Sequence, residues 1–231
     1  MGNFYLYIFI LLCFILAVSY YNTLVYANNS FTESFNSDKQ SFILLGDSIL
    51  KNDAYVPNKN NICSLLIERT NGKTICLAAD DSKIVNIYNQ ISNIPENLNN
   101  TNTTIFLSVG GNDILSQIEN KDENPFNNTK LLETIFVSYK KLVKSIQDKL
   151  PDANIVLVDI YYPDNSKYEK YHAIINKWNN QIYDYAKNSK NNINSVLKIS
   201  TILTQKDDFT VDIEPSSKGS EKLIESILTS Y

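Results

Sequence analysis

Short apolar runs alternate along this chain with segments of helical periodicity, and this alternation limits the possible folds more than any other feature. The first run, SFILLGDS at 41–48, ends in a turn, and four more follow at 74–78, 104–109, 154–160 and 195–199. Runs that are apolar without alternation are typical of strands buried on both faces of a parallel sheet. Apolar positions with helical spacing lie between and after them, at 60–69, 82–91, 130–150, 171–189 and 217–229. The pattern therefore predicts an α/β fold with helices on both faces of a mostly parallel sheet.

Length and composition agree with one such domain. The chain has 231 residues, 43% of them hydrophobic and 20% charged, which is enough to bury a core and excludes wholesale disorder. The net charge of −4 leaves no basic surplus for phosphate groups, so no nucleic-acid partner is expected. A single histidine excludes a multi-histidine metal site. No phosphate loop or dinucleotide fingerprint is present, and we expect no cofactor.

The first 27 residues are expected to be a targeting segment rather than part of the folded domain. An unbroken apolar run covers 4–18, and no charged residue precedes Glu33. Two interpretations remain open: a signal peptide cleaved after Ala27, or an uncleaved single-pass signal anchor. Either would send a polar tether at 28–40 and the domain at 41–231 into the secretory pathway, as a membrane-anchored or secreted protein.

A secretory location would make two further features relevant. Sequons for N-linked glycosylation begin at Asn28, Asn99, Asn102 and Asn127. Cys63 and Cys76 are either a disulfide pair, which an oxidising compartment permits, or two buried free thiols.

Polar residues follow two of the predicted strands at the points where they end. Gly46-Asp47-Ser48 closes the first strand, and Gly110-Gly111-Asn112-Asp113 closes the third. Ligands of parallel α/β sheets bind beyond the carboxyl ends of the strands. The Ser48 hydroxyl could act there as a nucleophile, and its backbone N–H and the Asn112 amide could stabilise an oxyanion. Asp47 and Asp113 are interpreted as structural residues that bond to local backbone.

With these two blocks, the chain resembles the SGNH or GDSL-type hydrolases, a family of esterases and lipases. VDIEPSSKGSEKLIESI near the end of the chain resembles the family's third block, so the similarity covers 41–231. The resemblance implies a three-layer α/β/α fold with a flavodoxin-like, five-stranded sheet. It also implies that Ser48 is the nucleophile, that Asn112 lies in the oxyanion hole, and that Gly46, Asp47, Gly110 and Gly111 support them.

The chain departs from the family at three positions. Glu214 stands where the family has its catalytic histidine, and Val211, followed by Asp212, stands where it has the acid of the triad. Asp81 takes the place of a glycine whose N–H completes the oxyanion hole. The expected oxyanion hole is thus Ser48, Asp81 and Asn112.

Glutamate can accept a proton from serine if its pKa suits the working pH. We expect Glu214 to be the base, with Asp212 or Asp208 raising its pKa by like-charge repulsion. The lone His172 is interpreted as a residue on a helix surface.

Two functions fit these residues. The first is an ester hydrolase that acts on an O-acyl group of a glycan or a lipid. The second is a catalytically inactive pseudoenzyme that serves as a membrane-associated or secreted binding module. The missing histidine favours the second, whereas the retained serine, glycines and asparagine favour the first.

Overall fold

The computed structural model describes residues 18–20, 40–118 and 125–231. It divides the chain into a unit at 1–39, of which only a helical piece at 18–20 is described, and a compact unit at 40–231. The predicted leader and tether otherwise lie outside the described residues. None of the helices in the described ranges has the length and hydrophobicity needed to cross a membrane.

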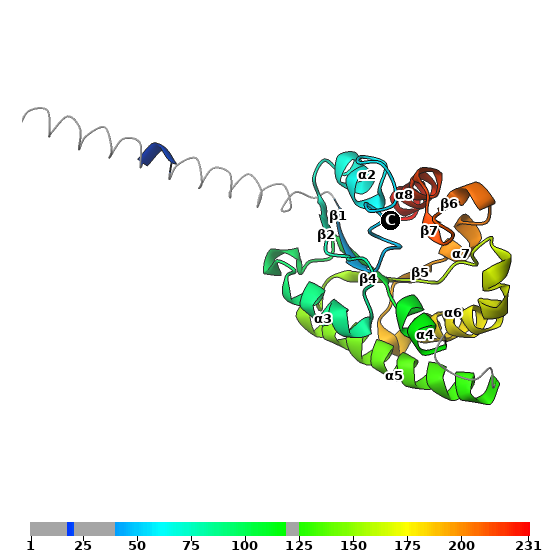
Figure 1. The fold of residues 1–231 in the computed structure, drawn as a ribbon. Coiled ribbons are helices and arrows are strands. Elements are labelled where there is room, and N and C mark those ends of the chain that lie inside the picture. The colour runs from blue at the N-terminus through cyan, green and yellow to red at the C-terminus, as the bar shows by residue number, and fades with distance from the viewer. Residues whose placement is uncertain (1–17, 21–39, 119–124) are drawn as a thin grey trace, which may run out of the picture. The chain divides into compact units, whose positions relative to one another are not determined.

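A five-stranded parallel sheet forms the centre of the compact unit (Figure 1). Its strands are β1 (Ser41–Gly46), β2 (Thr74–Cys76), β3 (Thr103–Ser108), β4 (Asn154–Val158) and β5 (Ser195–Leu197). They lie in the order β2-β1-β3-β4-β5, with Leu44 of β1 opposite both Cys76 of β2 and Phe106 of β3. This order is the flavodoxin-like one. The predicted fold class is therefore confirmed.

Helices cover both faces of the sheet, as Figure 1 shows. On one face, α2 (Ile62–Arg69) packs against α8 (Ser217–Ser230). On the other, α5 (Pro125–Lys149) contacts α3 (Ile84–Ser92), α4 (Gly111–Ile118) and α6 (His172–Lys187). The short helix α7 (Ile199–Ile202) follows β5, and 3-10 turns lie at Glu96–Leu98, Ser166–Tyr171, Ser189–Asn191 and Lys206–Asp208.

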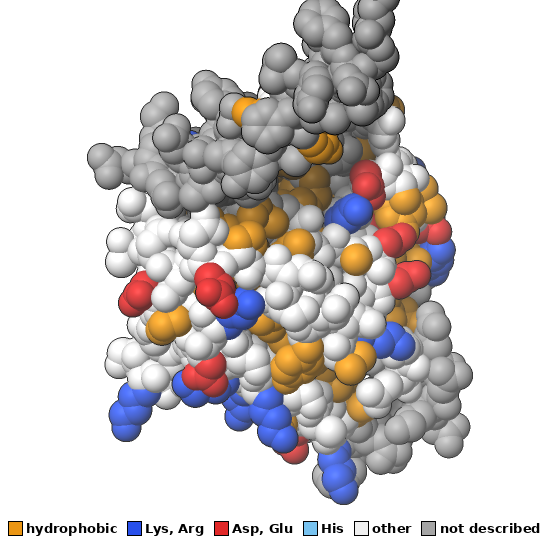
Figure 2. Space-filling model, turned by 90° about the vertical axis from the view of Figure 1, so that its left-hand side faces the viewer, with side chains coloured by type: hydrophobic (Ala, Val, Ile, Leu, Met, Phe, Trp, Pro, Cys, Tyr) orange, Lys and Arg blue, Asp and Glu red, His pale blue; other side chains and the backbone are white. Residues whose placement is uncertain are grey.

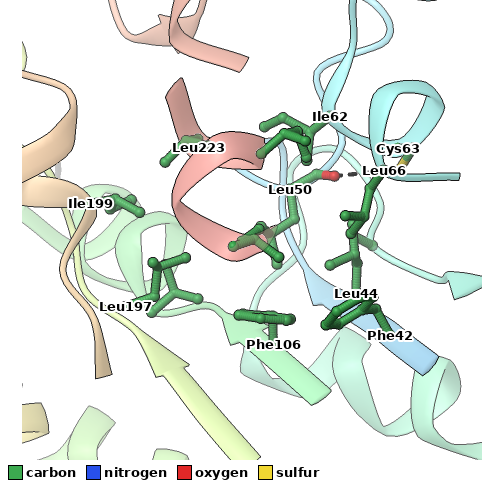
Figure 3. Close-up of a cluster of buried hydrophobic side chains, with 14 of the residues drawn as sticks. Phe42, Leu44, Leu50, Ile62, Cys63, Leu66, Phe106, Leu197, Ile199 and Leu223 are labelled. Atoms are coloured by element: carbon green, nitrogen blue, oxygen red, sulfur yellow. Dashed lines mark hydrogen bonds between the residues drawn. The ribbon is translucent and has the colours of Figure 1, made fainter. Parts of the chain in front are cut away.

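Alternation along the strands divides the core between the two faces. Phe42, Leu44 and Phe106 point toward α2 and α8, where they meet Leu50, Leu66 and Leu223 (Figure 3). All these side chains are buried, and the ring of Tyr231 closes the cluster with a T-shaped contact to Phe106 at 5.2 Å between centroids. On the opposite side, the fully buried Trp178 of α6 stands edge-on to Tyr139 of α5 at 5.4 Å.

Two elements were not expected from the sequence. α4 begins at Gly111, within the GGND segment that reads as a turn. A small antiparallel hairpin pairs β6 (Phe209–Thr210) with β7 (Glu214–Pro215). Its turn contains Val211 and Asp212, both with positive φ angles of 43° and 70°. Each of its strands has only two residues, which is too short for a periodic signal.

The surface on the side toward β2 carries charges of both signs (Figure 2). Lysine and arginine side chains gather along the lower edge of this view, and hydrophobic side chains form small areas between polar ones. The described part of this face that is visible therefore has no large patch of a single charge sign.

Candidate active site

The turn that carries Ser48 is held by the sheet itself. Gly46 ends β1 with a φ angle of 145°, and a Cβ there would lie 2.1 Å from the Ser108 carbonyl oxygen. Only glycine fits this close approach of two strands. The Gln90 side chain of α3 bonds to both sides of Gly46, accepting from its N–H and donating to its carbonyl at 2.8 Å each. Ser48 is therefore presented from a fixed strand end.

Asp47 supports the same turn. Its Oδ1 accepts hydrogen bonds from Ser108 Oγ at 3.0 Å and from the Ile49 N–H at 3.2 Å. Burial raises the pKa of Asp47 to about 7 against the effect of these bonds, and the nearby charge of Glu214 adds to the rise. Asp47 thus bonds to Ser108 on β3 as well as to the local backbone that we expected.

The glycine pair Gly110-Gly111 joins β3 to α4. Gly110 has a φ angle of 118°, and a Cβ on it would lie 2.3 Å from the Trp178 ring. Gly111 is the first residue of α4. Asp113, two residues on, accepts from the Ile84 N–H at 3.1 Å and so caps α3 rather than its own helix.

Glu214 lies beside Ser48, although 166 residues separate them in the chain. Ser48 Oγ donates a hydrogen bond to Glu214 Oε1 at 3.2 Å. Burial raises the pKa of Glu214 to about 7, the bond from Ser48 opposes this rise, and the charges of Asp80 and Asp81 add to it. The second carboxylate oxygen, Oε2, is buried and has no hydrogen-bond partner in the part of the chain that the structure describes.

The expectation that Asp212 or Asp208 raises the pKa of Glu214 is wrong. The exposed Asp212 lies in the hairpin turn, outside the cavity lining, where it pairs with Lys167 Nζ and accepts from Asn165 Nδ2 at 3.0 Å. Asp208 is buried in an ion pair with Lys222 at 2.7 Å. The acids that act on Glu214 are Asp80 and Asp81, on the loop after β2.

Both remaining donors of the expected oxyanion hole have partners within the protein. Asn112 Nδ2 donates to the Ser82 carbonyl oxygen at 3.2 Å. The Asp81 N–H donates to Asp80 Oδ1 at 3.0 Å. Asp81 has a φ angle of 55°, a conformation that aspartate adopts more readily than most residues other than glycine. It keeps the glycine-like backbone at this position.

Ser48, Asp81, Asn112 and Glu214 all line one cavity of about 140 Å³. Most of the other side chains that line it are apolar, and they come mainly from α4, α6 and the segment after β4; examples are Ile114, Leu115, Ile160, Tyr161, Ile174 and Ile175. Sequence reasoning missed this wall, because isoleucines at helical spacing read equally well as core. No lysine, arginine or histidine belongs to the described lining.

His172 lies outside the cavity lining. It is the first residue of α6, where its ring stands edge-on to Tyr162 at 5.3 Å between centroids. Among the described residues no three histidine, cysteine, aspartate or glutamate side chains come close enough together to hold a metal ion.

Cys63 and Cys76 form a disulfide that joins α2 to β2, with 5.9 Å between their Cα atoms. Cys63 Sγ lies 3.4 Å from the Leu50 carbonyl oxygen, two residues after Ser48 (Figure 3). Of the four sequon asparagines, Asn102 is exposed and Asn99 is half-buried against Asp152. Asn28 and the side chain of Asn127 lie outside the described residues.

No protein-family profile matches this chain, and no curated protein sequence does. Solved structures match it over most of the length of both chains. A member of the lipolytic G-D-S-L family from Veillonella parvula is 18% identical, with a TM-score of 0.59 over 83% of this chain and 98% of the other. A lipase from a goat rumen metagenome is also 18% identical, with a TM-score of 0.63 over 83% and 97%.

A phospholipase A1 from Streptomyces albidoflavus is 13% identical, with a TM-score of 0.58 over 84% of this chain and all of the other. At sequence identities this low, the similarity shows a shared fold and nothing more. The chain therefore has the fold of the G-D-S-L lipolytic proteins, and at that level the resemblance carried by its three sequence blocks is confirmed.

Proposed function

We propose that this chain is a serine ester hydrolase in which Ser48 is the nucleophile and Glu214 the general base. The observation that carries the proposal is the hydrogen bond from Ser48 Oγ to Glu214 Oε1 at 3.2 Å, within the cavity at the strand ends. A serine hydroxyl is a weak nucleophile until a neighbouring base takes its proton. Glu214 is the one carboxylate bonded to this hydroxyl among the described residues.

In the proposed reaction, Ser48 Oγ attacks the acyl carbonyl carbon while its proton passes to the Glu214 carboxylate. The tetrahedral intermediate collapses, the ester C–O bond breaks, and Glu214 returns the proton to the departing alcohol. Water then attacks the acyl carbonyl carbon while Glu214 takes its proton; the bond from Ser48 Oγ to the acyl carbon breaks, the carboxylic acid leaves, and Glu214 returns the proton to Ser48 Oγ. A pKa of about 7 for Glu214 suits both directions of transfer near neutral pH.

The developing oxyanion needs donors beyond the Ser48 N–H. Asn112 Nδ2 has a second hydrogen besides the one given to Ser82. The Asp81 N–H can contribute only after it leaves Asp80 Oδ1. We therefore assign most of the oxyanion stabilisation to Ser48 and Asn112, and expect Asp81 to contribute less than the glycine it replaces.

The apolar walls of the cavity support an ester with an apolar acyl group as the substrate. An O-acyl group on a lipid fits them better than a strongly polar acyl group would, and O-acyl glycans with a short acyl chain also fit. We propose further that the N-terminal segment directs the chain into the secretory pathway and ties it to a membrane if it stays uncleaved. Glycosylation at the exposed Asn102 belongs to the same proposal.

A specific observation also favours the pseudoenzyme. Among the described residues no side chain bonds to Glu214 Oε2, so none orients the base through its carboxylate, and the Asp81 N–H is occupied by Asp80. On this alternative, the cavity binds an acyl group or a similar apolar ligand without cleaving it.

Hydrolysis of a small activated acetyl ester by the full chain, measured from about pH 4 to pH 9, separates these functions. We expect activity to rise with pH through a midpoint near 7, as Glu214 loses its proton. Ser48→Ala and Glu214→Gln should each lose about a thousand-fold or more in kcat. Asp212→Asn, which removes an exposed carboxylate paired with Lys167, should retain the wild-type profile.

The opposite result is equally clear. If wild type and Ser48→Ala are equal at every pH, the hydrolase proposal fails. Activity gained by Glu214→His, or by that change together with Val211→Asp, would then identify a hydrolase site that has lost its base and the acid behind it.

A further inference from the structure

The carbonyl oxygens of the two residues on either side of Glu214 are each bound by a side chain from a distant part of the chain. Tyr161 Oη donates to the carbonyl oxygen of Ile213, the residue before Glu214. Asn52 Nδ2 donates to the carbonyl oxygen of Pro215, the residue after it, at 2.8 Å. Glu214 is thus held on both sides along its own backbone.

Asn52 connects β7, the strand that contains Glu214, to the segment that follows Ser48. It lies four residues after Ser48 and is fully buried. Its Nδ2 also donates to Ser220 Oγ on α8 at 2.7 Å, and its Oδ1 accepts from the Ile62 N–H at the start of α2 at 3.0 Å. Any displacement of β7 relative to Ser48 would therefore break bonds of a buried amide, which is costly.

Tyr161 holds the hairpin from the other side. It follows β4, is 4% exposed and lines the cavity. Its ring packs against Phe209 of β6 at 5.0 Å between centroids. The ring contact therefore acts on β6, and the hydroxyl bond acts on Ile213, the turn residue directly before β7.

Glu214 needs such restraint because its carboxylate would be better hydrated elsewhere. The hairpin has two residues in each strand, and its turn is exposed at Val211 and Asp212. Burying an ionised carboxylate without full compensation is unfavourable, so a free hairpin would let the side chain turn to water.

We propose that Asn52 and Tyr161 are positioning residues that hold the Glu214 carboxylate against the Ser48 hydroxyl. This inference rests on the proposed function for its consequence in catalysis, but the placement of Glu214 can be tested without any turnover.

The test measures the pKa of Glu214, which depends on the titratable groups around it. Asp80 and Asp81 raise its pKa from the loop after β2, and its own charge raises the pKa of Asp47, Tyr55 and Tyr161. Among the described residues no cation lines the cavity. A carboxylate released from these neighbours into water should therefore titrate closer to its ordinary value of 4.5.

The experiment follows the Glu214 carboxyl directly, by carbon-13 NMR of the full chain labelled at glutamate carboxyl carbons, with the signal assigned by its loss in Glu214→Gln. In Tyr161→Phe and Asn52→Ala we expect its pKa to fall from about 7 to below about 6. If the proposed hydrolysis is present, kcat should fall about ten- to a hundred-fold with KM changed less, and the acid limb of the pH profile should move to lower pH.

Two matched variants separate positioning from general damage. Tyr139→Phe removes a buried hydroxyl that has no hydrogen-bond partner among the described residues. Ser220→Ala removes only the branch of the Asn52 contacts that reaches α8. Both should leave the titration of Glu214 as in wild type.

An unchanged titration in Tyr161→Phe would overturn the positioning role of Tyr161, and the same result in Asn52→Ala would overturn that of Asn52. So would an equal shift in the matched controls. If Asn52→Ala does not fold, Asn52→Leu, which restores the lost volume without the amide, takes its place, and Tyr161→Phe, which keeps the ring, decides the role of Tyr161. Absence of Ser48-dependent turnover in wild type would refute the proposed function alone, because the NMR titration reports the position of Glu214 either way.

Discussion

The turn that presents Ser48 and the hairpin that presents Glu214 are built in opposite ways. Ser48 follows a strand paired on both sides, and Gly46, Gln90 and Ser108 hold its turn through backbone fit and short hydrogen bonds. Glu214 lies in a two-residue strand, next to a turn with two left-handed residues. The proposed nucleophile is placed by the sheet, whereas the backbone around the proposed base is bound by side chains from distant parts of the chain.

The same contrast is present in the sequence. The Ser48 block and the Asn112 block match the family pattern, whereas Glu214, Val211 and Asp81 depart from it. The departures from the pattern lie where support comes from individual side chains, and the matches lie where a substitution would disturb the sheet.

The largest effect on stability should follow from a substitution in the turn that presents Ser48. Gly46→Ala places a Cβ 2.1 Å from a backbone oxygen of β3 and holds alanine at a φ angle of 145°. Since neither the strand nor the oxygen can move freely, we expect the free energy of unfolding to fall by about 3 kcal/mol or more in chemical denaturation.

Gly72→Ala is the matched control for this prediction. Gly72 also has a positive φ angle, 80°, but a Cβ there meets nothing within 4 Å. Its cost should be about 1 kcal/mol, from backbone strain alone. Equal losses in the two variants would show that contact with β3 is not what makes the Ser48 turn rigid.

The pH dependence of stability tests the hairpin that presents Glu214. The pKa of Glu214 is about 7 in the folded chain and 4.5 when unperturbed, so the folded state binds more protons between these values. Stability should therefore fall as pH rises from about 4.5 to about 7, by about 3 kcal/mol from this residue. Denaturation of Glu214→Gln across this range should show a shallower slope than wild type.

Asp47 contributes a slope of the same sign, because its pKa is also raised to about 7. Part of the slope should therefore survive in Glu214→Gln and disappear when Asp47→Asn is added. A slope unaffected by Glu214→Gln would mean that the carboxylate is hydrated in the folded state, contrary to its burial beside Ser48.

The smallest effect should come from relieving the hairpin turn. Val211 is 66% exposed and has a φ angle of 43°, which is unfavourable for a β-branched residue. Asparagine tolerates this conformation, so Val211→Asn should raise the free energy of unfolding by about 1 kcal/mol. In thermal denaturation the same change at the exposed Val85, inside α3, should give no gain.

Much of this fold could be predicted from the sequence because its strands are long apolar runs. The five strands and the large helices lie at the predicted places, and the serine and asparagine blocks follow the predicted strand ends. The helix at Gly111–Ile118 was missed because its first residues favour turns as strongly as helix starts.

The support of Glu214 could not be predicted for a different reason. Asn52 and Tyr161 are ordinary residues in their local sequence, and their role depends on contacts across 163 and 52 residues. The same holds for Asp80 and Asp81, which act on Glu214 in place of Asp212 and Asp208. No local pattern reports which acids meet in space.

The long separation between Ser48 and Glu214 has a consequence for biosynthesis. A ribosome that adds about 5 to 20 residues per second reaches Glu214 roughly 10 to 30 seconds after Ser48. During that interval the emerging chain carries its serine without the carboxylate that would activate it. On the proposed mechanism, ester hydrolysis at Ser48 therefore waits until the hairpin has been translated and has docked beside the sheet.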